Sequence, residues 1–146
     1  MPTWPHHIAV YGPPGAGKTS LVETATAHGF PALDLEDVGG NYSERQTFLK
    51  ELADGGPRML LGAADLTPED LPTGTRLVLL APSDTELIRR VRTRGDRRGH
   101  KWVESALQVL GEHRLMAEAG VFDLVLESDG TPDDVLRIIV AWLEKA

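Results

Sequence analysis

The residues with the clearest chemical signature follow a short apolar run near the start of the chain. Gly12-Pro-Pro-Gly-Ala-Gly17-Lys18-Thr19 matches the pattern G-x-x-x-x-G-K-[ST] at every fixed position. In such a loop, backbone N–H groups turn inward around a phosphate, and the following helix adds the positive end of its dipole. The residues expected to hold a nucleoside triphosphate are Gly12, Pro13, Pro14, Gly15, Ala16, Gly17, Lys18, Thr19 and Ser20.

The two reactive side chains of this loop have separate expected roles. Lys18 is expected to bridge the β- and γ-phosphates, and the Thr19 hydroxyl to ligate Mg²⁺, so the predicted cofactors are ATP and Mg²⁺. The alternative is a glycine-rich turn that binds nothing. Because the motif follows a predicted strand, His7–Tyr11, and opens a predicted helix, Lys18–His28, its context favours the phosphate-binding interpretation.

Acidic residues follow two of the predicted strands. Asp34 ends the strand at residues 31–35, where a carboxylate would orient an acceptor hydroxyl, take its proton and share a water on Mg²⁺. Glu36 lies on the same side and is a candidate acceptor contact. Asp65 follows a third strand at residues 58–63 and is a candidate Mg²⁺ ligand through water. The alternative for Asp34 and Glu36 is that they cap or solubilise a loop, and the alternative for Asp65 is a turn residue before Thr67-Pro68.

A basic segment lies in the second half of the chain. The whole chain carries 15 basic and 22 acidic residues, a net charge of −7. The stretch at residues 89–101 holds seven cations and one acid, which leaves −13 on the remainder. Its cations are Arg89, Arg90, Arg92, Arg94, Arg97, Arg98 and Lys101. One interpretation is a solvated helix face; the other is an anion-binding lid, because so many neighbouring cations repel one another without an anion.

Length and composition exclude several classes of protein. The chain has 146 residues, of which 41% are hydrophobic and 25% charged, which predicts one folded domain over residues 1–146. Without cysteine, it has no disulfide, zinc finger, iron–sulfur cluster or thiol nucleophile. No signal peptide or membrane-length apolar run is present, so a cytoplasmic protein is expected.

Apolar runs alternate with amphipathic stretches along the chain, which predicts an α/β fold with a parallel sheet covered on both faces. Further strands are expected at residues 76–81 and 121–126. Capping-box spacings at Ser43/Gln46 and Ser83/Glu86 each predict a helix start. Helices are also expected at residues 102–119 and from Thr131 onward, where residues 128–131 can act as a helix cap.

Three stretches resemble the nucleoside-monophosphate kinase, shikimate kinase and dephospho-coenzyme A kinase group. They are the phosphate loop, Gly29–Asp37 and Leu87–Arg98. The resemblance implies a three-layer α/β/α P-loop fold with five strands in the order 2-3-1-4-5. It also implies that Arg90 or Arg94 lies against the adenine or the phosphates as a catalytic group. By the same resemblance, backbone groups of residues 128–131 contact the adenine; the alternative for them is a plain helix cap. Leu60–Asp65 lacks the glycine triplet and the D-G-[FY]-P-R signature of these families, so the acceptor is not carried over.

Four further arginines are candidates for binding phosphate oxygens. Arg97 and Arg98 lie in the expected lid, while Arg45 and Arg58 are candidates for gripping an acceptor phosphate. Arginine suits this role because its planar fork pairs bidentately with phosphate. The alternative for Arg45 and Arg58 is an exposed surface charge. The five histidines show no metal-ligand spacing and are interpreted as surface or packing residues.

These features together predict an ATP- and Mg²⁺-dependent phosphotransferase acting on a small metabolite or nucleotide. A GTPase is disfavoured, because no lysine stands in an [NT]-K-x-D element. Two alternatives stay open: a kinase of polynucleotide 5′ ends, and a nucleotide-dependent regulatory ATPase or switch. The acidic remainder of the chain disfavours nucleic acid without excluding it, no membrane partner is expected, and the protein is expected to be a monomer or homodimer.

Overall fold

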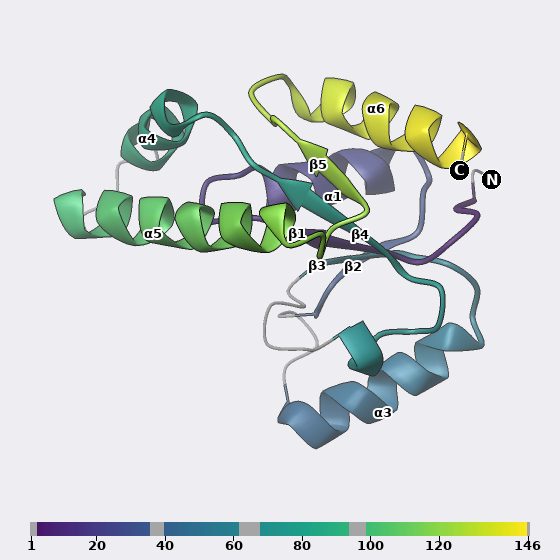
Figure 1. Ribbon diagram of the computed structural model, residues 1–146. Helices are drawn as coiled ribbons and strands as arrows, with labels where there is room; N and C mark the ends of the chain where they lie inside the picture. Colours follow the sequence, from purple (N-terminus) through teal and green to yellow (C-terminus); the bar gives the residue numbers. More distant parts are fainter. Residues whose placement is uncertain (1–2, 36–39, 62–67, 94–98, 146) are drawn as a thin grey trace.

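A computed structural model describes residues 3–35, 40–61, 68–93 and 99–145. It contains five strands: β1 (Ile8–Tyr11), β2 (Ala32–Asp34), β3 (Met59–Leu61), β4 (Arg76–Leu80) and β5 (Leu124–Leu126). All neighbouring strands pair in parallel, in the order β2-β3-β1-β4-β5. The predicted α/β fold class with its 2-3-1-4-5 sheet is therefore confirmed (Figure 1).

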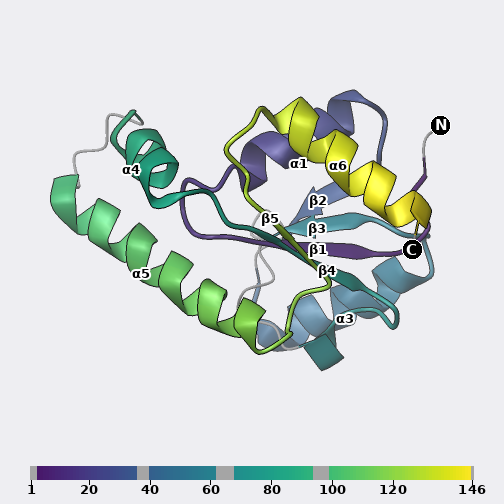
Figure 2. The same cartoon turned by 45° about the horizontal axis from the view of Figure 1, so that its top comes forward.

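Helices cover both faces of this sheet. They are α1 (Lys18–Ala27), α3 (Tyr42–Ala53), the 3-10 turn η1 (Pro68–Asp70), α4 (Asp84–Thr93), α5 (Gly99–Glu118) and α6 (Pro132–Lys145). Figures 1 and 2 show α1 and α6 side by side on one face and α3 on the other. In the described part of the chain, none of the helices combines the length and apolar character that a bilayer crossing requires.

The two cores follow from the alternation of side chains along each strand. In β1, Ile8 and Val10 join the cluster that packs against α1 and α6, whereas Ala9 and Tyr11 join the cluster on the α3 side. A third cluster, which includes Leu87 and Leu110, joins α4 to α5. Because α4 also packs against the loop after β1, this third cluster fixes the wall of the site described below.

Helix ends agree with most of the capping predictions. The helices α1 and α5 are followed by Gly29 and Gly120, whose φ angles of 84° and 81° suit the left-handed position after a helix. The Ser83 hydroxyl accepts a hydrogen bond from the Glu86 N–H at 3.3 Å, as its spacing predicts.

The predicted cap at Ser43 is wrong. Asn41 is the N-cap of α3, since its side-chain oxygen accepts a hydrogen bond from the Glu44 N–H at 2.9 Å. Asparagine ranks with serine at this position, and here it precedes the serine by two residues. Gln46, the expected second member of the box, instead donates to Asp70 at 2.8 Å and so ties α3 to η1.

Candidate active site

The loop between β1 and α1 requires glycine at three places. A Cβ atom on Gly12 would lie 2.8 Å from the Ala16 Cβ and 2.9 Å from the Leu80 carbonyl oxygen, so no side chain fits there. Gly15 and Gly17 have φ angles of 89° and 97°, which L-residues with side chains rarely adopt. The structure therefore explains the glycines of the motif, because they let the chain turn tightly between strand and helix.

The first turn of α1 is arranged to receive an anion. Its N-cap is Gly17, which offers no side-chain oxygen to the helix, and the turn holds no acidic residue. The first N–H groups of a helix lack intrahelical partners and carry partial positive charge. Within the described residues, this helix start therefore has the properties of a phosphate-binding site.

Lys18 reaches back across the loop. Its ammonium donates a hydrogen bond to the Gly12 carbonyl oxygen at 2.5 Å, although the two residues are at opposite ends of the motif. Thr19 and Ser20, which follow on α1, are both exposed. The three polar side chains predicted for triphosphate and metal thus come from one helix start, where solvent and ligands reach them.

A histidine of α5 lies near this lysine. Burial and, next, the positive charge of Lys18 lower the pKa of His113, while Glu112 acts in the opposite sense. The imidazole packs edge-on against Phe122, with ring centroids 6.3 Å apart. Sequence analysis missed this residue because α5 is about 80 residues away from the loop in the chain, and a lone histidine on a helix carries no signal of its own.

This arrangement makes a prediction about protonation. Lys18→Met should raise the pKa of His113, because the ammonium disfavours the imidazolium form, while burial keeps that pKa below the ordinary histidine value. Titration of the His113 ring protons by NMR measures the shift. The His113 titration of the wild-type protein under the same conditions serves as the reference. An unchanged His113 titration would show that the ammonium does not face the imidazole.

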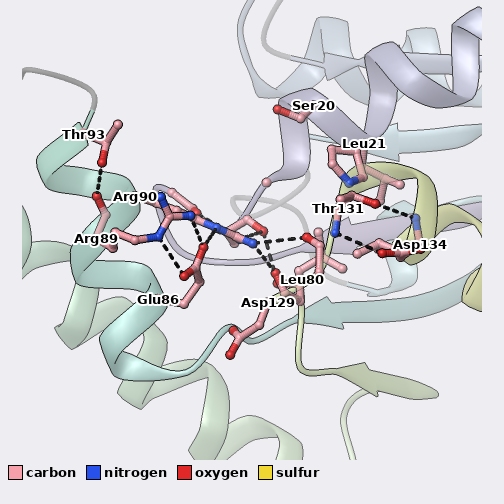
Figure 3. A pocket seen from close by; sticks show the side chains of 17 residues that line it. Ser20, Leu21, Leu80, Glu86, Arg89, Arg90, Thr93, Asp129, Thr131 and Asp134 are labelled. Carbon is pink, nitrogen blue, oxygen red and sulfur yellow. Dashed lines mark hydrogen bonds and ion pairs between the residues drawn. The ribbon is translucent and has the colours of Figure 1, made fainter.

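A pocket of about 620 Å³ adjoins the loop (Figure 3). Leu80 and three segments line it: Gly15–Gly17 with Ser20 and Leu21 of α1, the face of α4 that carries Glu86 and Arg90, and the turn from Ser128 to Pro132 with Asp134 and Val135. Volumes of this size are typical of sites for small molecules and cofactors. The pocket therefore places a ligand-sized space directly beside the predicted phosphate loop.

Arg90 occupies the junction of these three segments. Its Nη1 donates to the carbonyl oxygens of Gly15 and Ala16 at 3.5 and 3.1 Å, and its Nη2 to those of Ser128 and Gly130 at 2.5 and 3.4 Å. Its Nε donates to Glu86 at 3.0 Å. Hydrogen bonds first from Arg89 and then from Arg90 lower the pKa of Glu86 to about 2, so this carboxylate is charged at neutral pH.

The turn after β5 is held by its own side chains. Ser128 is buried, and its hydroxyl donates to the Ala16 carbonyl oxygen at 3.1 Å. Asp129 accepts from the backbone N–H and the hydroxyl of Ser83, each at 2.8 Å. Thr131 caps α6 by accepting a hydrogen bond from the Asp134 N–H at 3.2 Å, and residues 128–132 also line the pocket, so this stretch is both a helix cap and part of the pocket wall.

Asp34 and Arg58 end up at opposite edges of the sheet. Asp34 is the last residue of β2 and pairs with Leu61, at the carboxyl edge that also carries the phosphate loop. Arg58 precedes β3 at the amino edge, where its N–H donates to His7 Nδ1 at 3.2 Å. The structure therefore does not bring Arg58 to the site, because a residue that opens a parallel strand lies at the far end from one that follows it.

Arg45 lies on the first turn of α3, the helix that η1 holds through Tyr42 and Gln46. The other candidates fall outside the described residues: Glu36, Asp65, Arg94, Arg97 and Arg98. Within the described ranges, no three acidic or histidine side chains gather as a metal-binding group. In this part of the chain, Thr19 and Asp34 are the predicted metal contacts that the structure places.

Comparison with known proteins supports the fold. No protein-family model matches the chain, and no curated protein matches it. A gluconokinase from Sinorhizobium meliloti 1021 superimposes with a TM-score of 0.64 at 21% identity, over 99% of this chain and 94% of that one. A shikimate kinase from Acinetobacter baumannii, solved with shikimate, gives 0.66 at 20% identity over the same shares. The deoxyadenosine kinase of M. mycoides gives 0.57 at 17% identity, over 96% of this chain and 100% of that one.

The three neighbours differ in the substrates that their names state, but they share one architecture. The similarity covers nearly the whole of this chain and of each neighbour, so it includes the phosphate loop, the sheet and the helices around them. The resemblance drawn from three short stretches of sequence is confirmed for the entire chain at the level of the fold. This protein has the fold of the small-molecule P-loop kinases.

Proposed function

We propose that this protein is a kinase that moves the γ-phosphate of ATP, with Mg²⁺, to a small metabolite or nucleotide. The observation that carries the proposal is the phosphate loop, with a helix start free of competing side-chain caps, beside a pocket of about 620 Å³. The fold shared with gluconokinase, shikimate kinase and deoxyadenosine kinase supports the same class of reaction.

Each group at the carboxyl edge has a role in this proposal. The amides of residues 15–18 and the Lys18 ammonium bind the β- and γ-phosphates and stabilise the charge that develops on the γ-phosphoryl oxygens. Asp34 orients the acceptor hydroxyl and accepts its proton. Bound Mg²⁺ would neutralise charge on the phosphates, and Thr19 with Asp34 would hold it, directly or through water.

The donor base is proposed to be adenine rather than guanine. Reading the adjacent N1–H and N2–H donors of guanine requires a free acceptor pair such as a carboxylate. The three carboxylates that line the pocket each have internal partners: Glu86 with Arg89 and Arg90, Asp129 with Ser83, and Asp134 with Thr131 and Arg137.

We therefore expect ATP to bind at least about tenfold more tightly than GTP, which corresponds to one unmatched hydrogen-bond pair. Competition between the two nucleotides for the wild-type protein measures the ratio. As a control, Ser83→Ala removes one hydrogen bond to Asp129 and should reduce the discrimination by freeing an acceptor. Equal affinities in the wild-type protein would contradict the adenine assignment.

The acceptor is found by measuring ADP release across a panel of hydroxylated and phosphorylated compounds. The panel includes gluconate, shikimate and deoxynucleosides, which the names of the structural neighbours supply, together with nucleoside monophosphates and an oligonucleotide with a 5′ hydroxyl. A kinase should release ADP sharply faster with one class of acceptor, in a Mg²⁺-dependent manner. If no acceptor increases the rate of ADP release but a partner protein increases it, the regulatory ATPase would be favoured instead.

A further inference from the structure

Arg90 has no donor left for a phosphate. A guanidinium carries five N–H groups. In the structure they meet five acceptors: Glu86 Oε1 and the carbonyl oxygens of Gly15, Ala16, Ser128 and Gly130. The side chain is also largely shielded, with 19% of its area exposed. This distinguishes Arg90 from its neighbour Arg89, whose side chain is 62% exposed and bonds to Glu86 alone among the described residues.

The four carbonyls belong to two segments that are more than 100 residues apart. Gly15 and Ala16 form the turn of the phosphate loop, and Ser128 and Gly130 belong to the turn after β5 that lines the pocket, where the base is proposed to bind. Ser128 strengthens the same junction, because its buried hydroxyl donates to the Ala16 carbonyl oxygen at 3.1 Å. The Arg90 guanidinium, labelled in Figure 3, and the Ser128 hydroxyl therefore tie these two segments of the pocket together.

The bonds to Ala16 also fix an amide that a phosphate would use. In a planar trans peptide, the C=O and the next N–H point in opposite directions. Arg90 and Ser128 both draw the Ala16 carbonyl oxygen toward α4 and the β5 turn, at 3.1 Å each. The N–H of Gly17 is in the same peptide unit, so it is directed away from them and into the loop. Gly17 has a left-handed φ of 97°, and this peptide plane would otherwise rotate easily.

We propose that Arg90 is a positioning residue that locks the phosphate loop to the base-binding turn, rather than a ligand of the transferring phosphate. This inference rests on the proposed function, since it assigns the role of one residue within that site. Glu86 completes the lock by holding the Arg90 Nε from the first turn of α4. The lock aligns the loop amides before ATP arrives, so it contributes to nucleotide affinity. The groups that act in the chemical step, such as Lys18 and Asp34, do not depend on it.

The test compares Arg90→Ala, Arg90→Lys, Ser128→Ala and, as a charge control, Arg92→Ala. Arg92 is exposed, lies two residues farther along α4 and is not among the residues that line the pocket. The first readout is hydrogen exchange of the backbone amides at residues 15–18 and 127–131 in the protein without ligand. Arg90→Ala should raise exchange in both segments and leave the strands unchanged. Ser128→Ala should raise exchange in both segments to a smaller extent. Arg92→Ala should leave exchange unchanged in both segments.

The second readout is the affinity for ATP and the kinetics of ADP release. Arg90→Ala should weaken ATP binding about tenfold or more, with kcat at saturating ATP within about threefold of the wild type. Arg90→Lys should recover only part of this affinity, because an ammonium cannot meet carbonyls of two segments with a planar fork. If Arg90→Ala fails to fold, Arg90→Lys and Ser128→Ala carry both readouts.

The outcomes separate the inference from the proposed function. If Arg90→Ala lowered the turnover rate about 100-fold and left ATP affinity unchanged, Arg90 would be a transition-state ligand and the inference would be overturned. Unchanged exchange in both segments of the Arg90 and Ser128 variants would overturn it as well. A wild-type protein that binds no ATP would instead overturn the proposed function, and the exchange measurement would still decide whether Arg90 locks the two segments.

Discussion

Lys18→Ala is expected to lower the rate of acceptor-dependent ADP release by about 100- to 1000-fold. The ammonium lies over the loop, within 2.5 Å of the Gly12 carbonyl oxygen, at the place where the β- and γ-phosphates are expected. Removing it takes away a charge that stabilises the transferring phosphoryl group in the transition state. Steady-state rates at saturating acceptor, together with ATP affinity by calorimetry, measure the effect.

The fold should survive this substitution. Lys18 is the first residue of α1 and is only partly buried, and alanine has the higher helix propensity. The matched control is Lys50→Ala, which removes an exposed lysine from the last turn of α3, and its rate should stay within about twofold of the wild type. A Lys18→Ala variant that keeps more than about a tenth of the rate would contradict the proposed role of the loop.

The parts of the site that could be predicted from sequence are those that local chemistry determines. The phosphate loop is contiguous, and its glycines are required by backbone angles and close approaches that involve only neighbouring elements, as at Gly12 and Gly17. The parallel sheet follows from continuous apolar strands such as residues 77–80, which are buried on both faces. The strand order depends on the resemblance, which summarises a topology that periodicity alone does not determine.

The parts that could not be predicted depend on contacts between distant segments. The resemblance implies that Arg90 or Arg94 lies against the adenine or the phosphates, and in the structure the five donors of Arg90 meet Glu86 and four backbone carbonyls. Nothing in its own helix indicates those carbonyls. The same holds for His113, whose proximity to Lys18 arises only when α5 packs beside the loop.

Arg58 illustrates a different limit. Its place at the start of a strand is visible in the sequence, and the direction of a parallel strand puts such a residue at the edge opposite the phosphate loop. Its N–H instead bonds to His7, whose pKa is lowered by burial and then by the Arg58 charge. Position within an element, together with residue type, therefore decides whether an arginine is a candidate for the site.

Asp34→Asn should have the second large effect on activity. It should lower kcat, whereas Arg90→Ala should weaken ATP binding. An amide of the same shape cannot accept the proton of an acceptor hydroxyl, so kcat is expected to fall about 100-fold or more. ATP affinity measured without Mg²⁺ should change less than about threefold, because Asp34 ends β2, which is separated from β1 and its loop by β3. A kinetic comparison with Arg90→Ala then separates the acceptor side of the site from the nucleotide side.

The control for this variant is Asp54→Asn, which makes the same chemical change on an exposed residue. Asp54 is the C-cap of α3. The control substitution should leave both kcat and ATP affinity unaltered. If Asp34→Asn instead weakened ATP binding and left kcat intact, Asp34 would act through Mg²⁺ and the triphosphate rather than through the acceptor. Full activity in Asp34→Asn would remove it from the site, and the base would then have to come from another residue at the carboxyl edge.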